Sequence, residues 1–314
     1  MVIARSVEDI AYRPASIVTV GTFDGVHRGH AAIIQQVVRR AKETGARSVI
    51  VTFEPHPREV VGQGPVELLT TLEERLEFIG ALGADAIVVL PFTYEFSRLT
   101  PNEFYETIMV KAIGVSEVIE GTDHMFGRDR EANIETLKAL GSRFGFRVTA
   151  AVTVLDNGEP ISSSRIRAAL KEGNVEAAEE LLDRPYGLRG TVVAGDGRGA
   201  QLGYPTANVQ PASAKKIVPA NGVYVAGVEI GNELRYGMLN IGVRPTLTSG
   251  SERVVEVHVF ELNEDLYGKQ LRIQFLKRLR NEIKFSSKEE LVDQLRRDRS
   301  ESLKFVEALQ SQYE

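Results

Sequence analysis

The first half of the chain contains a strand pattern that leads directly into a glycine-rich turn. Residues 17–20 are all β-branched and mostly apolar, and the string GTFDGVHRGH follows directly at residues 21–30. Apolar residues then recur at helical spacing over residues 31–42, and Gly45 ends that pattern. A buried strand, a tight turn and a helix in this order predict the beginning of a βαβ unit.

Further patterns continue this alternation through the first half of the chain. Strand patterns lie at 48–53, 86–90, 118–119 and 147–154, and helical patterns lie at 72–82 and 101–113. Thr100 and Glu103 are spaced as a capping box at the start of the later helix. We therefore expect an α/β domain with a parallel sheet, which binds ligands at the carboxyl ends of its strands near a topological switch.

The second half has shorter strand patterns separated by clusters of Gly, Asn and Asp. These patterns lie at 191–194, 222–230, 234–241, 254–260 and 271–276. Their spacing predicts an antiparallel sheet or a small barrel. The change of pattern, with Pro185 and Gly187 as punctuation, predicts two domains, over residues 1–184 and 185–314.

A last helix is predicted from Ser287, which is spaced as a capping box with Glu290. Its apolar stripe is expected to consist of Leu291, Leu295, Leu303, Val306 and Leu309.

Composition excludes several kinds of chemistry. The 314 residues contain no cysteine, which excludes disulfides, thiolate metal sites and a cysteine nucleophile. The net charge of −5 argues against a nucleic-acid partner, and no apolar run has the length of a membrane span. We expect a cytoplasmic protein, monomeric or weakly homo-oligomeric, with no nucleic-acid or membrane partner.

The helix after the glycine turn begins with His27 and His30, three residues apart. Glycines in the turn allow a ligand to approach the backbone, and the free N–H groups of a helix N-terminus attract anions. A lone histidine here would more simply cap the helix. The paired spacing after a strand instead predicts an anion pocket suited to phosphate oxygens.

A second glycine-rich stretch, residues 195–203, leads into the string PTAN at 205–208. The stretch is not a Walker A loop, but its backbone amides can converge on phosphate. Thr206 and Asn208 are two residues apart, so in an extended segment they project to the same side. Their oxygen atoms are ligands that Mg²⁺ prefers.

The motifs of both halves resemble those of the bacterial bifunctional riboflavin kinase/FMN adenylyltransferase (FAD synthetase) family. In the first half the resemblance rests on GTFDGVHRGH, which contains the HxGH element of nucleotidyltransferases, on FEPHP at 53–57 and on ISSSRIR at 161–167. In the second half it rests on RGAQLGYPTAN at 198–208, NGVY at 221–224, NIGVRPT at 240–246, VEVH at 255–258, DLYG at 265–268 and LRNEIKF at 279–285.

The resemblance implies a Rossmann-like α/β nucleotidyltransferase domain with a parallel sheet. A small antiparallel β-barrel riboflavin kinase domain with a C-terminal helix would follow it. The implied reactions are phosphorylation of riboflavin by ATP to FMN, and transfer of AMP from a second ATP to FMN. The second reaction gives FAD and releases pyrophosphate.

Roles for particular residues follow from the resemblance. In adenylyl transfer, His27 and His30 would contact the ATP phosphates, and Ser164 and Arg167 would contact the transferring and leaving phosphates. In the kinase, Thr206 and Asn208 would hold Mg²⁺, and Glu256 would be the general base. His258, two residues further along the strand, is expected to support packing or hydrogen bonding.

The remaining nucleotide- and flavin-binding residues implied by the resemblance are Gly21, Phe23, Asp24, Gly25, Gly29, Asp123, Ser162, Ser163, Gly197, Arg198, Gly199, Gly203, Pro205, Asn240 and Arg280. For His56, a structural role in a turn and a ligand role are both open. His124 and Met125 replace an aromatic and a basic residue that are usual in the family. Two functional alternatives therefore remain: a riboflavin kinase with weak or absent FAD synthetase activity, and a flavin-sensing regulatory protein.

Overall fold

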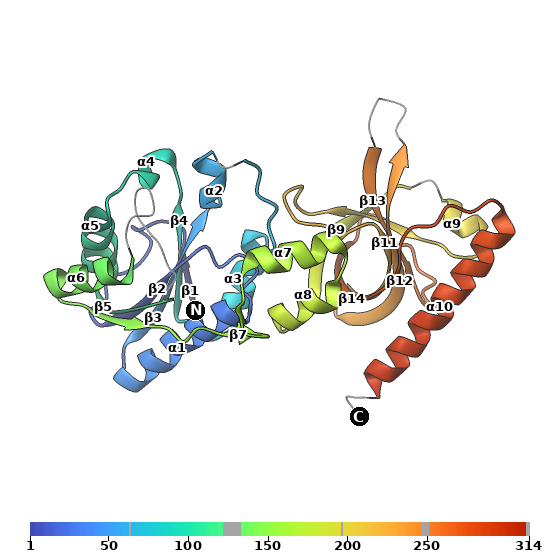
Figure 1. Cartoon of the computed structure of the whole chain (residues 1–314). Coiled ribbons are helices and arrows are strands. Elements are labelled where there is room, and N and C mark those ends of the chain that lie inside the picture. Colours follow the sequence, from blue (N-terminus) through green and yellow to red (C-terminus); the bar gives the residue numbers. More distant parts are fainter. Residues whose placement is uncertain (63, 122–132, 196, 246–250, 312–314) are drawn as a thin grey trace. The chain divides into compact units, whose positions relative to one another are not determined.

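The chain forms two compact units, Met1–Ser163 and Ser164–Glu314. The structure, a computed structural model, describes residues 1–62, 64–121, 133–195, 197–245 and 251–311 (Figure 1). Each unit has its own sheet, and the two sheets are of different kinds, as the change of sequence pattern predicts.

The first unit contains a six-stranded sheet in the order β1-β4-β3-β2-β5-β6. All of its strand pairs are parallel. The strands are β1 (Val2–Ala4), β2 (Ser16–Val20), β3 (Arg47–Glu54), β4 (Ala86–Pro91), β5 (Val115–Glu120) and β6 (Arg147–Ala150). The chain runs outward from β2 through β3 and β4, then returns to the other side of β2 as β5. The predicted parallel sheet is thus confirmed, with its topological switch beside β2.

Apolar cores cover both faces of this sheet. Successive side chains of a strand point to opposite faces, so strands that are apolar at consecutive positions present apolar side chains to both. On one face Ile17 packs with residues of α1 (Arg28–Thr44) and α3 (Leu72–Ala81). On the other face its neighbour Val18 packs with the segment 104–113 and with α6 (Ile134–Phe144). Two short helices, α2 (Pro57–Val60) and α4 (Tyr94–Ser97), lie in the loops that follow β3 and β4.

Three local expectations in this unit need correction. The predicted helix over 101–113 begins with the expected capping box, but only α5 (Pro101–Phe104) is α-helical; Tyr105–Ile113 is a π-helix. The strand predicted over 147–154 ends at Ala150, and a small hairpin of β7 (Leu155–Asp156) and β8 (Glu159–Pro160) follows. Strand β1 was not predicted, since a three-residue strand is too short to show a period.

The second unit contains a closed antiparallel barrel in the order β10-β13-β12-β11-β14-β9, which confirms the predicted small barrel. Its strands are β9 (Tyr186–Val193), β10 (Ala207–Pro211), β11 (Gly222–Ile230), β12 (Glu233–Pro245), β13 (Ser251–Val259) and β14 (Gln270–Arg280). The other elements are the helices α7 (Ser163–Glu172), α8 (Val175–Leu182), α9 (Arg198–Gln201) and α10 (Lys288–Gln310).

The C-terminal helix α10 begins at the predicted cap, and its buried face includes polar residues. The Ser287 side chain accepts from the Glu290 amide, whereas the Glu290 carboxylate accepts from Ser286. The fully buried residues of α10 are Asp298, Ser302 and Val306. The predicted leucines, Leu291, Leu295, Leu303 and Leu309, are half-buried, and Leu309 packs against the cluster that contains Val306. The predicted apolar stripe is therefore confirmed in part, with two polar residues within the buried face. Asp298 is buried because it forms an ion pair with β14, described below.

Helices α7 and α8 pack with the barrel. The Ala220 amide donates to the carbonyl of Leu170 at 2.9 Å, and Arg278 Nη1 donates to the carbonyl of Glu172 at 2.8 Å. Compactness therefore divides the chain before α7, whereas the functional boundary expected after residue 184 stays a prediction. None of the helices within the described ranges combines the length and apolar character needed to cross a membrane.

Candidate active sites

The His27–His30 pair lies in the turn after β2, beside the topological switch. Backbone geometry makes His27 the N-cap of α1, and its Nδ1 accepts a hydrogen bond from the His30 amide at 3.3 Å. The two imidazoles are stacked, with ring centroids 3.6 Å apart and an interplanar angle of 20°. Because Nδ1 accepts, a neutral His27 carries its proton on Nε2, where it can be donated to a ligand. His27 therefore both caps α1 and stacks on His30.

The surroundings of His30 favour its neutral form. Burial, and then the charge of His27, lower the pKa of His30 well below its usual value. His30 is therefore neutral in the free protein near neutral pH. Its Nδ1 is also buried without a hydrogen-bond partner in the described structure, a group that a polar ligand would satisfy.

The glycines of the turn have observed roles in packing this pair. A Cβ at Gly29 would lie 3.2 Å from the His27 ring, and one at Gly21 would lie 3.0 Å from the Phe23 ring. Phe23 is buried and meets His30 edge-on, with centroids 5.3 Å apart. Gly25 has a φ of +88°, which favours glycine. These residues shape the histidine pair; their direct contact with a nucleotide stays a prediction.

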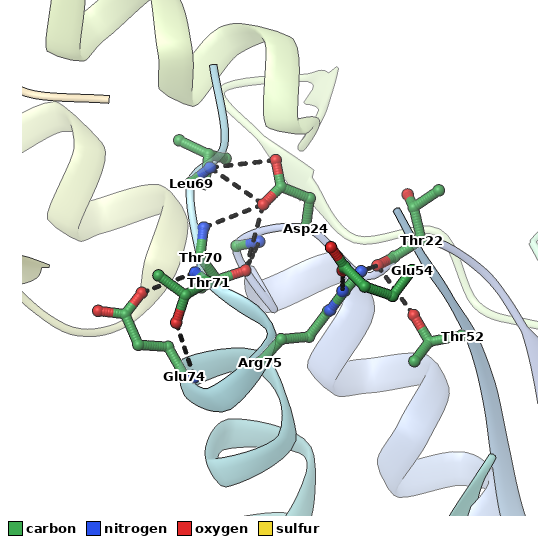
Figure 2. A network of polar contacts seen from close by, with 10 residues as sticks. Thr22, Asp24, Thr52, Glu54, Leu69, Thr70, Thr71, Glu74 and Arg75 are labelled. Atoms are coloured by element: carbon green, nitrogen blue, oxygen red, sulfur yellow. Dashed lines mark hydrogen bonds and ion pairs between the residues drawn. The ribbon is translucent and has the colours of Figure 1, made fainter. Parts of the chain in front are cut away.

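Asp24 has an observed role in the loop. Its carboxylate is buried and accepts from the Leu69 amide at 3.0 and 3.1 Å and from the Thr70 amide at 3.0 Å (Figure 2). The Gly25 amide in turn donates to Thr70 Oγ1 at 3.0 Å. The side chain thus anchors one loop to another, while its predicted ligand contact remains untested.

One residue of the ISSSRIR segment, Ser163, contacts the glycine turn within the first unit. Ser163 Oγ donates to the backbone carbonyl of Asp24 at 2.9 Å. Helix α7 begins at Ser163, and Ser164 and Arg167 lie in its first turns. The ligand roles of these two residues and of Ser162 stay predictions.

The predictions for His56 and Asp123 have different outcomes. His56 is buried, and its Nδ1 accepts from the Arg58 amide at 3.2 Å, so it caps α2. Of its two open roles, the structural one is observed. Asp123, with His124 and Met125, lies outside the described residues.

In the second unit, strand register aligns the proposed kinase residues. Glu256 on β13 pairs with Asn208 on β10 and with Asn240 on β12. Cross-strand partners share one face of a sheet, so these three side chains lie on one face of the barrel wall. Val255 and Val257 are buried, whereas Glu256 is half-buried, as the strand alternation requires.

The PTAN segment is held against the same wall. His258 Nδ1 lies 2.8 Å from the carbonyl of Pro205, and its ring meets Tyr204 edge-on at 5.4 Å between centroids. These contacts confirm the supporting role predicted for His258.

Glycines around PTAN allow close backbone approach. A Cβ at Gly195 would lie only 1.9 Å from the Asn208 amide nitrogen, and one at Gly199 would lie 3.2 Å from Thr206 Oγ1. Gly197 and Gly203 have φ values of +65° and +82°. Arg198 begins α9, but its side chain lies outside the described part of the structure.

The side chain of Arg280 forms an ion pair with Asp298 of helix α10. Its Nε donates to both carboxylate oxygens of Asp298, at 3.0 and 3.1 Å, and its Nη2 donates to Oδ2 at 2.7 Å. This bidentate ion pair holds α10 on the barrel. The flavin proximity predicted for Arg280 stays a prediction, and its observed role is structural.

Sequence reasoning missed Arg75, whose guanidinium is buried among the residues that Figure 2 draws. A signal was present: Arg75 falls at the i+3 position after Leu72 and directly before Leu76, on the apolar face of the predicted helix. A charged residue at a core position of an amphipathic helix indicates a buried partner.

Comparison with known families agrees with both halves of this description. Residues 9–165 match the family model described as FAD synthetase, and residues 182–306 match the one described as riboflavin kinase. Among solved structures, a chain described as a macrolide-efflux protein from Streptococcus pneumoniae is 33% identical. It has a TM-score of 0.86, and the match covers 95% of this chain and 97% of the other.

Full-length relatives combine the two activities. The bifunctional riboflavin kinase/FMN adenylyltransferase of Bacillus subtilis is 35% identical, covering 94% of this chain and 93% of its own. The protein of the same name from Escherichia coli K12 is 35% identical, covering 95% and 96%, and that of Pseudomonas fluorescens is 38% identical, covering 88% of each. The chain therefore belongs to the bifunctional riboflavin kinase/FMN adenylyltransferase family.

Proposed function

We propose that this bifunctional enzyme carries out its two reactions at the two sites described above. Adenylyl transfer from ATP to FMN takes place at the His27–His30 pair. Phosphorylation of riboflavin takes place on the barrel wall that carries Asn208, Asn240 and Glu256. The observations that carry the proposal are the stacking of His27 on His30 in the first unit and the pairing of Glu256 with Asn208 and Asn240 in the second.

In adenylyl transfer, the chain's own residues bind and orient phosphates. His27 donates from Nε2, and His30 satisfies its buried, unpartnered Nδ1 on the ligand. Ser164 and Arg167 contact the transferring and leaving phosphates. No covalent enzyme intermediate is required, because alignment and charge neutralisation lower the barrier to this transfer.

In the kinase reaction, Glu256 takes the proton from the primary hydroxyl of the ribityl chain as the hydroxyl attacks the γ-phosphate of ATP, and the bond from the γ-phosphorus to the β–γ bridging oxygen breaks to release ADP. Asn240, opposite Glu256 in the strand register, flanks the carboxylate. The glycine-rich stretch 197–203 contacts the nucleotide phosphates through its backbone amides.

The donor set fits Mg²⁺. Thr206 and Asn208 offer a hydroxyl and an amide oxygen, both hard ligands. Among the described residues no cluster of three or more His, Asp or Glu side chains forms a complete metal cage. Mg²⁺ is usually bound by one or two protein oxygens together with substrate phosphates, and when bound it neutralises phosphate charge.

The proposal includes the setting of the enzyme. It acts in the cytoplasm as a monomer or weak homo-oligomer, on small molecules and without a nucleic-acid or membrane partner. The cysteine-free composition fits a reducing compartment, and the net charge of −5 fits small-molecule substrates better than a polyanionic partner.

Two variants test the assignment of sites. Purified His27→Ala and Glu256→Ala proteins are given ATP and Mg²⁺ with either riboflavin or FMN, and the flavins are separated chromatographically. We expect His27→Ala to lose FAD formation and retain FMN formation. Glu256→Ala should lose FMN formation and still convert supplied FMN to FAD.

Each variant serves as the folding control for the other activity. Loss of both activities from either single change would contradict two separate sites. Retention of FAD formation by His27→Ala would remove the histidine pair from the proposal, while the family's two activities would stand.

A further inference from the structure

The side chain of Arg75 connects the ends of two neighbouring parallel strands. It is only 4% exposed, and it reaches from α3 to the turn after β2 and to the last residue of β3. Nη1 donates to the carbonyl of Thr22 at 2.7 Å, and Nη2 donates to Glu54 Oε2 at 2.6 Å (Figure 2). Thr52 Oγ1 also donates to the Thr22 carbonyl, at 3.1 Å.

The same segment holds the turn at a second point. Leu69 and Thr70, just before α3, bind the carboxylate of Asp24, two residues beyond Thr22. A reciprocal capping box of Thr71 and Glu74 fixes the start of α3 between these two attachments. Residues 69–75 therefore hold the turn on both sides of Phe23, directly before His27.

Stability alone does not account for a buried arginine at this position. The Glu54 side chain is 37% exposed, and an ion pair with a solvent-exposed partner contributes little to stability. The Nε of Arg75 is also buried without a hydrogen-bond partner in the part of the chain that the structure describes. A leucine would suit the apolar face of α3 better, but only a planar guanidinium can reach the Thr22 carbonyl and the Glu54 carboxylate together.

We propose that Arg75 is a positioning residue for adenylyl transfer. Arg75 acts through its contacts with Thr22 and Glu54 and not by touching a reactant. By fixing the Thr22 carbonyl against Glu54, it holds the turn that places the stacked His27 and His30 rings for the transition state. The inference rests on the proposed role of the histidine pair.

The first test compares Arg75→Met and Arg75→Lys with Arg39→Met, which removes an exposed guanidinium from α1 of the same unit. We expect Arg75→Met to lower kcat for FAD formation by roughly 100-fold, the typical effect of a small misplacement of catalytic groups. KM for ATP should change much less, because ground-state contacts remain. Arg75→Lys should recover part of kcat, and Arg39→Met should match the wild type.

The second test asks whether Arg75 acts through the histidines. Groups that act as a unit are strongly non-additive, so Arg75→Met should cost almost nothing further in the residual FAD formation of a His27→Ala enzyme, measured at high enzyme concentration over long incubation. A purely structural role would not produce this dependence. Losses that multiply in the double variant would overturn the proposal, as would an Arg75→Met enzyme with wild-type kcat.

Folding of the first unit is monitored by thermal unfolding, and FMN formation reports on the second unit. If Arg75→Met does not fold, Arg75→Lys and Glu54→Gln replace it. Glu54→Gln removes the anionic partner and leaves the Thr22 contact, so it should lower kcat for FAD formation by less than Arg75→Met. A Glu54→Gln enzyme and an Arg75→Lys enzyme that both retain full kcat would contradict the inference.

The outcomes separate this inference from the proposed site. If His27→Ala abolishes FAD formation and the Arg75 variants do not lower it, only the role of Arg75 is wrong. If His27→Ala leaves FAD formation intact, the role of the histidine pair is wrong, and the positioning role of Arg75 is wrong with it.

Discussion

The two proposed sites of this enzyme are positioned by different physical means. The histidine site lies in a turn after a parallel strand, and buried side chains such as Arg75 and Asp24 hold that turn. The kinase site lies on three adjacent antiparallel strands, where backbone pairing alone sets Asn208, Glu256 and Asn240 side by side. The geometry of the first site therefore depends on a few buried side chains. The geometry of the second depends on strand pairing and on glycines that leave room for the side chains beside them.

The largest effect is expected from displacing the Asn208 side chain at the proposed kinase site. A Cβ at Gly195 would lie 1.9 Å from the side-chain Nδ2 of Asn208, so Gly195→Ala must displace that side chain. We expect FMN formation to fall by roughly 100-fold with FAD formation from FMN unchanged. Both rates are measured by separating the flavins after timed incubation.

Gly187 on β9 is the matched control for this change. A Cβ there has its nearest neighbour at 3.6 Å, an ordinary contact, so Gly187→Ala should leave FMN formation at the wild-type rate. Equal losses from the two substitutions would mean that general strand distortion, and not Asn208, is responsible.

A smaller effect is expected from the ion pair that holds α10 on the barrel. Arg280→Met leaves Asp298, which is 3% exposed, without its bidentate partner. We expect a loss of about 2 kcal/mol in unfolding free energy, at the lower end for broken buried pairs because Arg280 is partly exposed. Chemical denaturation measures it.

The same variant tests the flavin contact that the sequence suggested for Arg280. If Arg280 is structural, KM for riboflavin should stay near the wild-type value at temperatures where the variant is folded. A raised KM with unchanged stability would instead mean that Arg280 contacts the flavin.

The smallest expected effect concerns a buried anchor in the parallel sheet. The Val20 amide donates to Glu120 Oε1 at 2.7 Å, and burial raises the pKa of Glu120 well above its usual value of 4.5. The folded state then binds more protons than the unfolded state above pH 4.5, so this group's contribution to stability falls as pH rises. Glu120→Gln keeps an acceptor oxygen and should remove that fall, as measured by Tm across the pH range.

Glu117, on the same strand, provides a control of opposite sign. Burial disfavours its charge, but hydrogen bonds from Thr149 and Arg40 outweigh burial and lower its pKa. Its contribution is present above the ordinary carboxyl pKa and is lost as pH falls. Glu117→Gln should therefore lower Tm near neutral pH, with the difference shrinking in acid. Parallel behaviour of the two variants would contradict this account.

Much of the fold was predictable because its signals are local. The consecutive apolar residues of β2, β3 and β4 predicted a sheet covered on both faces, and the Thr100 and Ser287 caps located two helix starts. Where the signal was short or irregular, as in β1 and the π-helix at Tyr105–Ile113, the prediction failed.

The candidate sites were predictable to a similar degree. The spacing of His27 and His30 after a strand indicated a phosphate site, and the two-residue spacing of Thr206 and Asn208 indicated a shared side of an extended segment. The sequence did not distinguish residues that meet a ligand from residues that build the site. Phe23 and His56 have observed roles of the second kind.

Local patterns in the sequence were enough to predict the alternation of strands and helices in the first half, the class of each sheet and the histidine and PTAN motifs, since periodicity, caps and motif spacing act over a few neighbouring residues. The pairing of Glu256 with Asn208 and Asn240, the ion pair between Arg280 and α10, and the contacts of Arg75 with the turn before His27 are seen only in the folded structure. The reason is that strand register and buried polar pairs join residues far apart in the chain. A buried charge finds its partner through packing, which no local pattern of residues encodes.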